Sequence, residues 1–266
     1  MKNKEFEMGV LEKFSLKGKI AIVTGGAGLY GRCIVEGLAE AGGCVYIASR
    51  NVEKCKKLAD ELKSKGYSAS SAELDQTDTE SIIRLKDKVI TEQGKIDILV
   101  NNAVLRPMKS PDSPIEDFDL SMKVNATGIV NITRIIAEEM KKRKAGVIIN
   151  ISSIYGVLGA DPYLYEGTDM GLPAPDYFFH RAGIINLTRY YASLLGPYNI
   201  RVNCISPGGL FNNQHPEFVK RYSKKTFLGR MANSEDIKGI VVFLASDASS
   251  YITGENIMMD GGLSAK

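Results

Sequence analysis

The amino-acid sequence predicts an α/β protein built on a doubly wound parallel sheet, with helices on both faces. Short apolar runs alternate with longer stretches of helical periodicity from residue 19 to residue 259. The chain has 266 residues, 44% of them hydrophobic, which is enough for one large core. Its 26 glycines gather near the ends of predicted strands rather than in a low-complexity tract. Together these features favour repeated strand–helix–strand units with tight turns.

Each element follows from its local pattern. Strands are predicted over residues 19–24, 44–48, 68–74, 96–100, 147–151, 201–205 and 257–259. Helices are predicted over residues 29–41, 51–65, 78–93, 123–144 and 182–195, with Asp78 placed to cap the third of them. No repeat, linker or compositional break divides the chain. We therefore predict a single domain over residues 16–266, preceded by an N-terminal extension over residues 1–15.

Composition excludes several classes of function. The 34 basic and 31 acidic residues give a net charge of only +3, so neither nucleic acid nor a membrane surface is expected as a partner. Two histidines and four cysteines without a C-x-x-C pair argue against a metal site, and the cysteines are expected to be buried thiols. The first residues lack a signal-peptide pattern, and no apolar run is long enough to span a bilayer. The sequence thus predicts a cytoplasmic protein.

Three loops follow predicted strands and are rich in proline and glycine. They cover residues 106–114, 156–175 and 207–216. Because ligands of open parallel sheets bind at the carboxyl ends of the strands, these loops are expected to form the rim of an active site.

The turn after the first strand carries a phosphate-binding pattern. Its sequence, Thr-Gly-Gly-Ala-Gly-Leu-Tyr-Gly over residues 24–31, contains G-x-G-x-x-G between a strand and a helix. Glycines there allow a tight turn and bring the helix N-terminus close to a pyrophosphate. The pattern predicts dinucleotide binding on a sheet of the Rossmann type.

From about Leu16 onward, the chain resembles the short-chain dehydrogenase/reductase family, in its compact single-domain branch. Thr24, Gly25 and Gly31 fit the family fingerprint T-G-x-x-x-G-x-G, although Leu29 stands at the middle glycine and Gly28 comes one residue early. That literal spacing matches the family's longer, epimerase-like branch. Later motifs match the compact branch: Asn-Asn-Ala at 101–103 with Val104 in place of glycine, and Pro-Gly-Gly at 207–209.

The resemblance implies a nicotinamide cofactor and an alcohol/carbonyl oxidoreduction. The implied cofactor contacts are Gly25, Gly28, Leu29, Gly31, Ser49, Arg50, Asp75, Asn102, Ala103, Tyr177, Arg181, Pro207 and Gly208. No acid ends the second strand, where one would bind the ribose of NAD, and Arg50 can pair with the 2′-phosphate of NADP. We therefore predict NADP, with NAD as the alternative.

The same resemblance implies four catalytic residues. Tyr177 is the acid/base, Ser153 binds the substrate oxygen, and Asn125 supports the helix and a proton relay. Arg181 stands where the family has lysine, four residues after the tyrosine. Residues at that spacing share a helix face, so the guanidinium can lower the tyrosine pKa, although it does not pass on its own proton. Ser152 is expected to face away from Ser153.

Several alternatives remain open at this stage. The interval of 24 residues between Ser153 and Tyr177 is longer than the family's usual spacing, and Tyr165 is the other candidate tyrosine. The polar segment between them suits a hydroxylated substrate such as a sugar, polyol or nucleotide-sugar. Leu29, Val104 and Arg181 motivate a cofactor-binding protein with weak or no catalysis, and an epimerase is a third hypothesis. Homodimers or homotetramers are implied by the resemblance.

Overall fold

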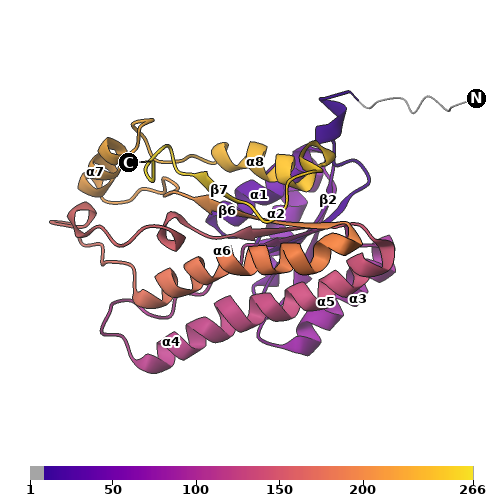
Figure 1. Cartoon of the computed structure of the whole chain (residues 1–266), viewed down its shortest axis with the longest axis horizontal. Coiled ribbons are helices and arrows are strands. Elements are labelled where there is room, and N and C mark those ends of the chain that lie inside the picture. Colours follow the sequence, from indigo (N-terminus) through magenta and orange to yellow (C-terminus); the bar gives the residue numbers. More distant parts are fainter. Residues whose placement is uncertain (1–8, 266) are drawn as a thin grey trace, which may run out of the picture.

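The computed structural model describes residues 9–265, so residues 1–8 of the expected N-terminal extension lie outside the described part. Seven strands form one parallel sheet in the order β3-β2-β1-β4-β5-β6-β7 (Figure 1). Their bounds are β1 Ile20–Thr24, β2 Cys44–Ser49, β3 Ala69–Glu73, β4 Ile98–Asn101, β5 Gly146–Ile151, β6 Ile200–Pro207 and β7 Asn256–Met259. The order reverses direction at β1 and β4, which makes the sheet doubly wound.

Helices cover both faces of this sheet, as expected. Helices α1, α2 and α8 pack on one face, and α3, α5 and α6 pack on the other (Figure 1). The helices are α1 Leu29–Glu40, α2 Val52–Ser64, α3 Thr79–Gln93, α4 Ile115–Met122, α5 Gly128–Arg143, α6 Pro175–Leu195, α7 Pro216–Lys225 and α8 Asp236–Ala245. Among residues 9–265, none of the helices is both long and apolar enough to cross a bilayer.

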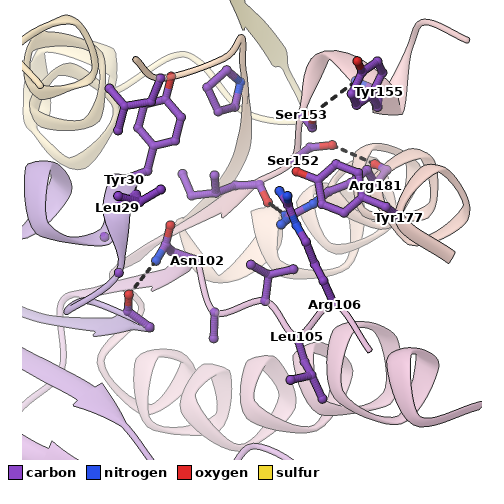
Figure 2. A pocket seen from close by; sticks show the side chains of 18 of the residues that line it. Leu29, Tyr30, Asn102, Leu105, Arg106, Ser152, Ser153, Tyr155, Tyr177 and Arg181 are labelled. Atoms are coloured by element: carbon purple, nitrogen blue, oxygen red, sulfur yellow. Dashed lines mark hydrogen bonds between the residues drawn. The ribbon is translucent and has the colours of Figure 1, made fainter. Parts of the chain in front are cut away.

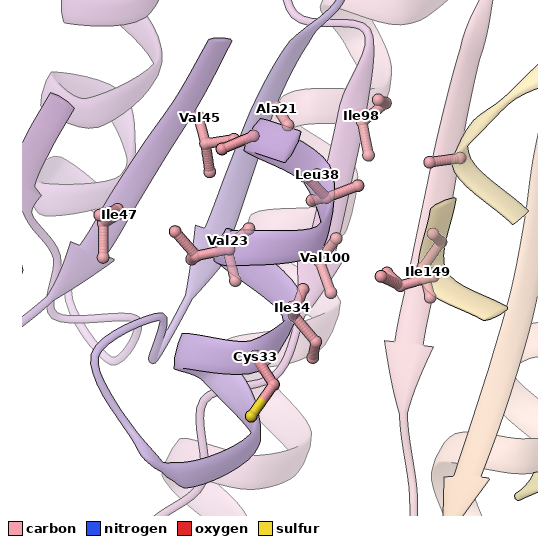
Figure 3. Close-up of a cluster of buried hydrophobic side chains, with 14 of the residues drawn as sticks. Ala21, Val23, Cys33, Ile34, Leu38, Val45, Ile47, Ile98, Val100 and Ile149 are labelled. Atoms are coloured by element: carbon pink, nitrogen blue, oxygen red, sulfur yellow. The ribbon is translucent and has the colours of Figure 1, made fainter. Parts of the chain in front are cut away.

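The core consists of two layers because strand side chains alternate between the faces of the sheet. On β1, Ala21 and Val23 face α1, while Ile20 and Ile22 face the opposite layer. Figure 3 shows Leu38 and Ile34 of α1 over the strand side chains of the first layer. Burial of every residue of β1 fits a strand covered on both faces.

The predicted strands agree with the observed ones to within two residues at either end. Two helix predictions are wrong at their start. The helix predicted over 123–144 belongs to a longer helical run that begins at Ile115, after Pro114, and α6 begins at Pro175 rather than at residue 182. Proline is favoured at a helix start, so both prolines mark boundaries that apolar periodicity missed. Helices α7 and α8 were not anticipated.

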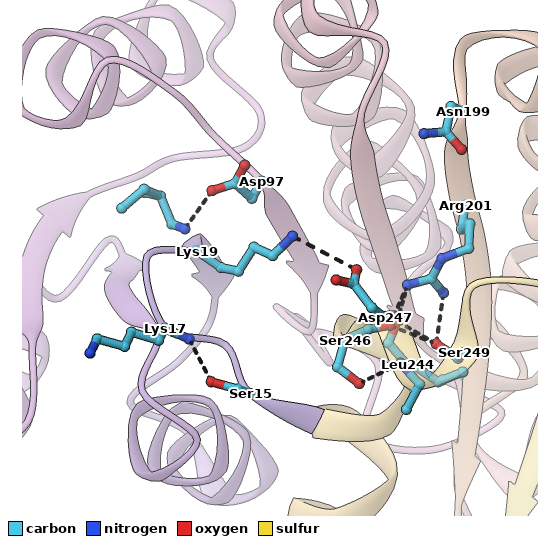
Figure 4. A network of polar contacts seen from close by, with 12 residues as sticks. Ser15, Lys17, Lys19, Asp97, Asn199, Arg201, Leu244, Ser246, Asp247 and Ser249 are labelled. Atoms are coloured by element: carbon cyan, nitrogen blue, oxygen red, sulfur yellow. Dashed lines mark hydrogen bonds and ion pairs between the residues drawn. The ribbon is translucent and has the colours of Figure 1, made fainter. Parts of the chain in front are cut away.

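A polar network secures the edge of the sheet opposite the strand carboxyl ends. Arg201, near the start of β6, donates to the carbonyl oxygens of Leu244 and Ser246, each at 2.9 Å, and to Ser249 Oγ at 2.8 Å (Figure 4). The last carbonyls of a helix lack partners within the helix. Arg201 is the partner of two such carbonyls at the end of α8, and so fixes that helix against the sheet.

Candidate active site

A cavity of about 560 Å³ opens where β1, β4, β5 and β6 end. All the residues assigned to cofactor contacts from the sequence line this cavity, namely Gly25, Gly28, Leu29, Gly31, Ser49, Arg50, Asp75, Asn102, Ala103, Tyr177, Arg181, Pro207 and Gly208. Ser153 lines it as well, and Asn125 does not. The three proline- and glycine-rich loops contribute Arg106, Tyr165 and Leu210 to its walls.

The turn between β1 and α1 is held against the end of β4. Thr24 Oγ1 accepts hydrogen bonds from the backbone N–H groups of Asn102 and Ala103, at 3.1 and 3.0 Å. Gly25 has a φ of +62°, and a Cβ there would lie 2.7 Å from the Cα of Ala103. No side chain caps the N-terminus of α1. Its first N–H groups thus face a site suited to a phosphate.

Gly31 is the tightest point of this turn. A Cβ at Gly31 would lie 2.2 Å from the carbonyl oxygen of Gly25 and 2.8 Å from Asn102 Nδ2. We expect Gly31→Ala to displace the turn and to weaken NADPH binding at least tenfold, since overpacking costs about 1–3 kcal/mol. A fluorescence titration with NADPH measures this directly, because the chain has no tryptophan.

Gly183→Ala is the matched control for that substitution. Gly183 lies within α6, and a Cβ there would meet nothing within 4 Å. Its NADPH affinity should equal that of the wild type. Equal affinity in Gly31→Ala as well would show that the turn does not approach the cofactor.

The far end of the cavity, at β2 and β3, carries opposite charges. Arg50 is exposed there, immediately after β2, and Asp75 is the one carboxylate among the cavity-lining residues. Hydrogen bonds from the Thr77 backbone N–H and hydroxyl, at 2.9 and 2.7 Å, lower the pKa of Asp75, and the charge of Arg50 lowers it further. Asp75 is therefore a carboxylate fixed by its own loop.

Tyr177 lies in the first turn of α6 with its ring between cationic groups. The Cζ of Arg106 is 4.1 Å from the ring centroid, and the Cζ of Arg181 is 4.9 Å from it (Figure 2). Burial raises the pKa of the hydroxyl. The charges of Arg181 and Arg106, together with hydrogen bonds to Ser153 and Arg106, outweigh burial and lower the pKa to about 8.

Arg181 is held in place by the end of β5. Its guanidinium donates to the carbonyl oxygen of Ile151, and Ser152 Oγ donates to its backbone carbonyl at 2.7 Å (Figure 2). Only 4% of Arg181 is exposed, and its Nε has no partner among the described residues. Ser152 therefore contacts the helix backbone, whereas Ser153 contacts Tyr177. The two serines diverge as expected.

The sequence placed the loop of Arg106 at the rim of the site but gave Arg106 itself no role there. It follows β4 by a few residues, at the start of one of the proline- and glycine-rich loops. Cation and ring approach each other across 71 residues of sequence, so no local pattern marks the pair. Its place directly after the Asn-Asn-Ala strand end was the available signal, because that edge of the sheet carries the ligand.

Asn125 lies behind the cavity wall and holds the loop that carries Arg106. Its Oδ1 accepts from the Leu105 N–H at 2.9 Å, and its Nδ2 donates to the Leu105 carbonyl at 2.6 Å. It belongs to a π-helical turn, Lys123–Thr127 (η2), between α4 and α5. The Val124 carbonyl accepts instead from Gln76 Nε2 at 2.7 Å. π-turns are frequent at functional sites.

A roof of two segments covers the other half of the cavity. Tyr165, Met170 and Pro173 come from the segment after β5, while Phe218 and Tyr222 come from α7. Arg221 of α7 ties the two together by donating to the carbonyls of Tyr163, at 3.0 Å, and Glu166. The Tyr165 hydroxyl lies 2.8 Å from that of Tyr155, and burial raises the pKa of both.

His180 belongs to the scaffold around Tyr177. It is 3% exposed, does not line the cavity, and meets the Tyr177 ring edge-on with centroids 5.3 Å apart. Burial, followed by the charges of Arg181 and Arg106, lowers its pKa to about 3. The imidazole is therefore neutral near pH 7, as packing beside two cations requires.

Comparisons with known proteins agree with this geometry. A family model described as enoyl-(acyl carrier protein) reductase matches residues 28–264. A 3-oxoacyl-[acyl-carrier-protein] reductase, FabG, of Aquifex aeolicus is 33% identical over 257 residues, covering 94% of this chain and 99% of that protein. A gluconate 5-dehydrogenase from Burkholderia cenocepacia, solved with NADP and tartrate, superposes with a TM-score of 0.87 at 29% identity, covering 97% of this chain and 100% of that chain.

An NAD⁺-bound xylitol dehydrogenase is similar too. It has a TM-score of 0.81 and 30% identity, and the match covers 93% of this chain and 99% of that one. The family match at residues 28–264 includes the Asn-Asn-Ala strand end and the helix that bears Tyr177. The chain belongs to the short-chain dehydrogenase/reductase family of NAD(P)-dependent oxidoreductases.

Proposed function

We propose that this protein interconverts an alcohol and a carbonyl with NADP(H), using Tyr177 as the acid/base. The observation that carries this proposal is the Tyr177 hydroxyl, which lies at the cavity with its pKa lowered to about 8. A general acid/base works best when its pKa lies near the working pH. An isolated buried tyrosine would titrate far above that range.

The roles of the neighbouring side chains follow from their contacts. When bound, the cofactor supplies or accepts the hydride. Ser153 Oγ accepts from the Tyr155 N–H at 3.2 Å and lies beside Tyr177, so its hydroxyl is placed to bind the substrate oxygen next to the acid/base. During oxidation Tyr177 takes the hydroxyl proton, and during reduction it returns a proton to the carbonyl oxygen. Arg181 favours the tyrosinate form electrostatically.

The cavity fits a nicotinamide dinucleotide along its length. The uncapped N-terminus of α1 and the close-packed glycine turn suit the pyrophosphate. At the end of β2, the exposed guanidinium of Arg50 suits a 2′-phosphate. The relatives named above are bound to NADP in one structure and NAD⁺ in the other. We therefore propose NADP as the preferred cofactor.

Arg50→Asp tests that preference. We expect the substitution to lower kcat/KM for NADPH by about ten- to hundredfold, because a charge-assisted hydrogen bond contributes about 1.5–3 kcal/mol. The value for NADH should stay level or rise. Arg84→Asp, which changes an exposed arginine on α3, is the control. An unchanged cofactor preference in Arg50→Asp would remove Arg50 from the cofactor site.

A turnover assay separates catalysis from cofactor binding alone. NADPH is mixed with the protein, and its consumption is followed with a panel of keto-sugars, ketones and acyl ketones. Steady loss of NADPH with at least one of them supports the oxidoreductase. Binding of NADPH without turnover across the panel supports the second candidate, a cofactor-binding protein, which the replacement of the family's lysine by Arg181 favours.

A hydroxylated substrate is the class that we propose. The segment after β5 brings the hydroxyls of Tyr155 and Tyr165 to the cavity roof, beside Met170 and Pro173. Two of the similar structures are named for gluconate and xylitol, both polyhydroxylated. The keto-sugars of the panel should therefore react faster than simple ketones.

We also propose that the chain forms a homodimer or homotetramer through α5 and α6. Phe179, Tyr190 and Leu194 are large side chains of α6 that stay 47–66% exposed in the single chain. Exposed apolar side chains on one element suit an interface. Analytical ultracentrifugation should give a mass at least twice the 29.1 kDa of the chain. A mass of one chain would refute this.

A further inference from the structure

We propose that Arg106 binds an anionic group of the substrate, a carboxylate or a phosphate, close to the reacting carbon. The inference rests on the proposed function, because it assigns a substrate class to the same site. It starts from the position of Arg106, whose guanidinium reaches from the loop after β4 to Tyr177 in the substrate half of the cavity (Figure 2).

Among the described residues, the charge of Arg106 has no fixed counter-ion. No ion pair joins it to a carboxylate of the described residues within 4 Å. Asp75, the one carboxylate that lines the cavity, comes from the loop after β3, and β2, β1 and β4 separate that strand from β5. A cation in a partly closed, largely apolar cavity attracts a complementary anion. Its planar fork suits a carboxylate or a phosphate in particular.

Arg181 does not compete for this role. It is buried, and its guanidinium donates to the Ile151 carbonyl. Arg50, the third cavity-lining arginine, lies at the end of β2, which is separated from β5 by β1 and β4. Of the three, only Arg106 combines exposure with contact to Tyr177. An anion beside the reacting oxygen therefore meets Arg106 first.

The backbone around Arg106 is built to hold it in one place. The side chain of Asn125 hydrogen-bonds both the backbone N–H and the carbonyl of the preceding Leu105. Pro107 follows Arg106 and has a fixed φ. Met108, next in the chain, is only 6% exposed, and Lys109 Nζ donates to the Arg106 carbonyl at 2.7 Å. A rigid loop lowers the entropy cost of presenting the guanidinium to a ligand.

The contact with Tyr177 limits where the anion lies. Because the Cζ of Arg106 lies 4.1 Å from the centroid of the Tyr177 ring, a group bound to the Arg106 guanidinium lies near the oxygen that exchanges a proton with Tyr177. The structure therefore favours hydroxy or keto compounds with an acidic group near the reacting carbon. Neutral polyols lack that contact and should be poorer substrates.

Tyrosinate absorbance in the near ultraviolet tests the proposal without turnover. Tyr177 is the tyrosine whose pKa is lowered, to about 8, so its ionisation forms a separate low step in the titration. An anion on Arg106 neutralises a charge that favours tyrosinate, and should move that step to higher pH in a saturable way. The protein is titrated with saturating NADPH and either tartrate, inorganic phosphate or neutral xylitol, at constant ionic strength.

The variants define the expected outcome. In Arg106→Gln, the ionisation step of Tyr177 should lie at higher pH even without an added anion. This variant should bind tartrate or phosphate about ten- to hundredfold more weakly. Arg106→Lys should keep part of the charge effect and lose the two-donor contact. Arg84→Gln, on the outside of α3, should behave like the wild type.

Each result has one meaning. A shift with tartrate alone assigns carboxylate substrates, and a shift with phosphate alone assigns phosphorylated ones. The proposal is wrong if neither anion shifts the wild-type step more than xylitol does, or if Arg106→Gln responds as the wild type does. Turnover of a neutral carbonyl together with an unshifted step would refute the anion site and leave the oxidoreductase intact.

Discussion

Replacing Tyr177 by phenylalanine should lower kcat by about 10²- to 10⁴-fold, the usual contribution of a positioned acid/base. The hydroxyl is the one group at the cavity with its pKa lowered to about 8, and phenylalanine keeps the ring between Arg106 and Arg181. NADPH affinity should change only slightly, since at most one hydrogen bond is lost. Initial rates with the best carbonyl of the panel, together with a fluorescence titration, measure both quantities.

Tyr165→Phe is the matched control because Tyr165 was the other candidate tyrosine. Its hydroxyl pairs with that of Tyr155 in the roof, and burial raises its pKa. We expect that variant to keep kcat within a few-fold of the wild type, with its main effect on KM. A severe loss of kcat in Tyr165→Phe, together with near-normal kcat in Tyr177→Phe, would make Tyr165 the acid/base instead.

Removing the charge of Arg181 should move the pH dependence of the reaction. Alcohol oxidation requires tyrosinate, so its kcat/KM should rise with pH and level off above about pH 8. The charge of Arg181 is the largest effect that opposes burial of Tyr177. Arg181→Met removes this charge, so the pKa of Tyr177 rises. The rising limb therefore shifts to higher pH. A tyrosine pKa that is higher by about one leaves about tenfold less tyrosinate at neutral pH.

Arg181→Lys distinguishes charge from shape at this position. Lysine keeps a cation beside Tyr177, so the limb should stay closer to its wild-type position than in Arg181→Met. The planar contact with the Ile151 carbonyl is not reproduced, and we expect weaker cofactor binding. Carbonyl reduction should show the opposite limb, which falls above about pH 8. A limb that does not move in Arg181→Met would mean that Arg181 acts on Tyr177 only through packing.

The elements that the sequence predicts well are those whose signals are local. Apolar runs place the strands, and the glycines after β1 place the first helix, because a tight turn and a helix start depend on adjacent residues. The prediction of Tyr177 as the acid/base rests on the helix that follows it rather than on its distance from Ser153. The long segment between them made that distance uninformative.

The parts that the sequence missed depend on contacts between distant segments. Arg106 meets Tyr177, and Asn125 meets Leu105, through a fold that brings the ends of β4 and β5 together. Asn125 was expected to support its helix and a proton relay, and its contacts with Leu105, which hold the loop that carries Arg106, were not foreseen. A role transferred by sequence position names the residue but does not place its contacts.

The π-turn at Asn125 has a consequence for the whole helical run from Ile115 to Arg143. Successive residues of an α-helix are about 100° apart, and one additional residue in a turn rotates all that follows by about that angle. The run thus has two phases: Phe118 of α4 meets Phe179 of α6, while Ile132 and Ile136 of α5 face the sheet. Deleting one residue from this turn would restore a single phase, but only by misaligning one of the two contact faces.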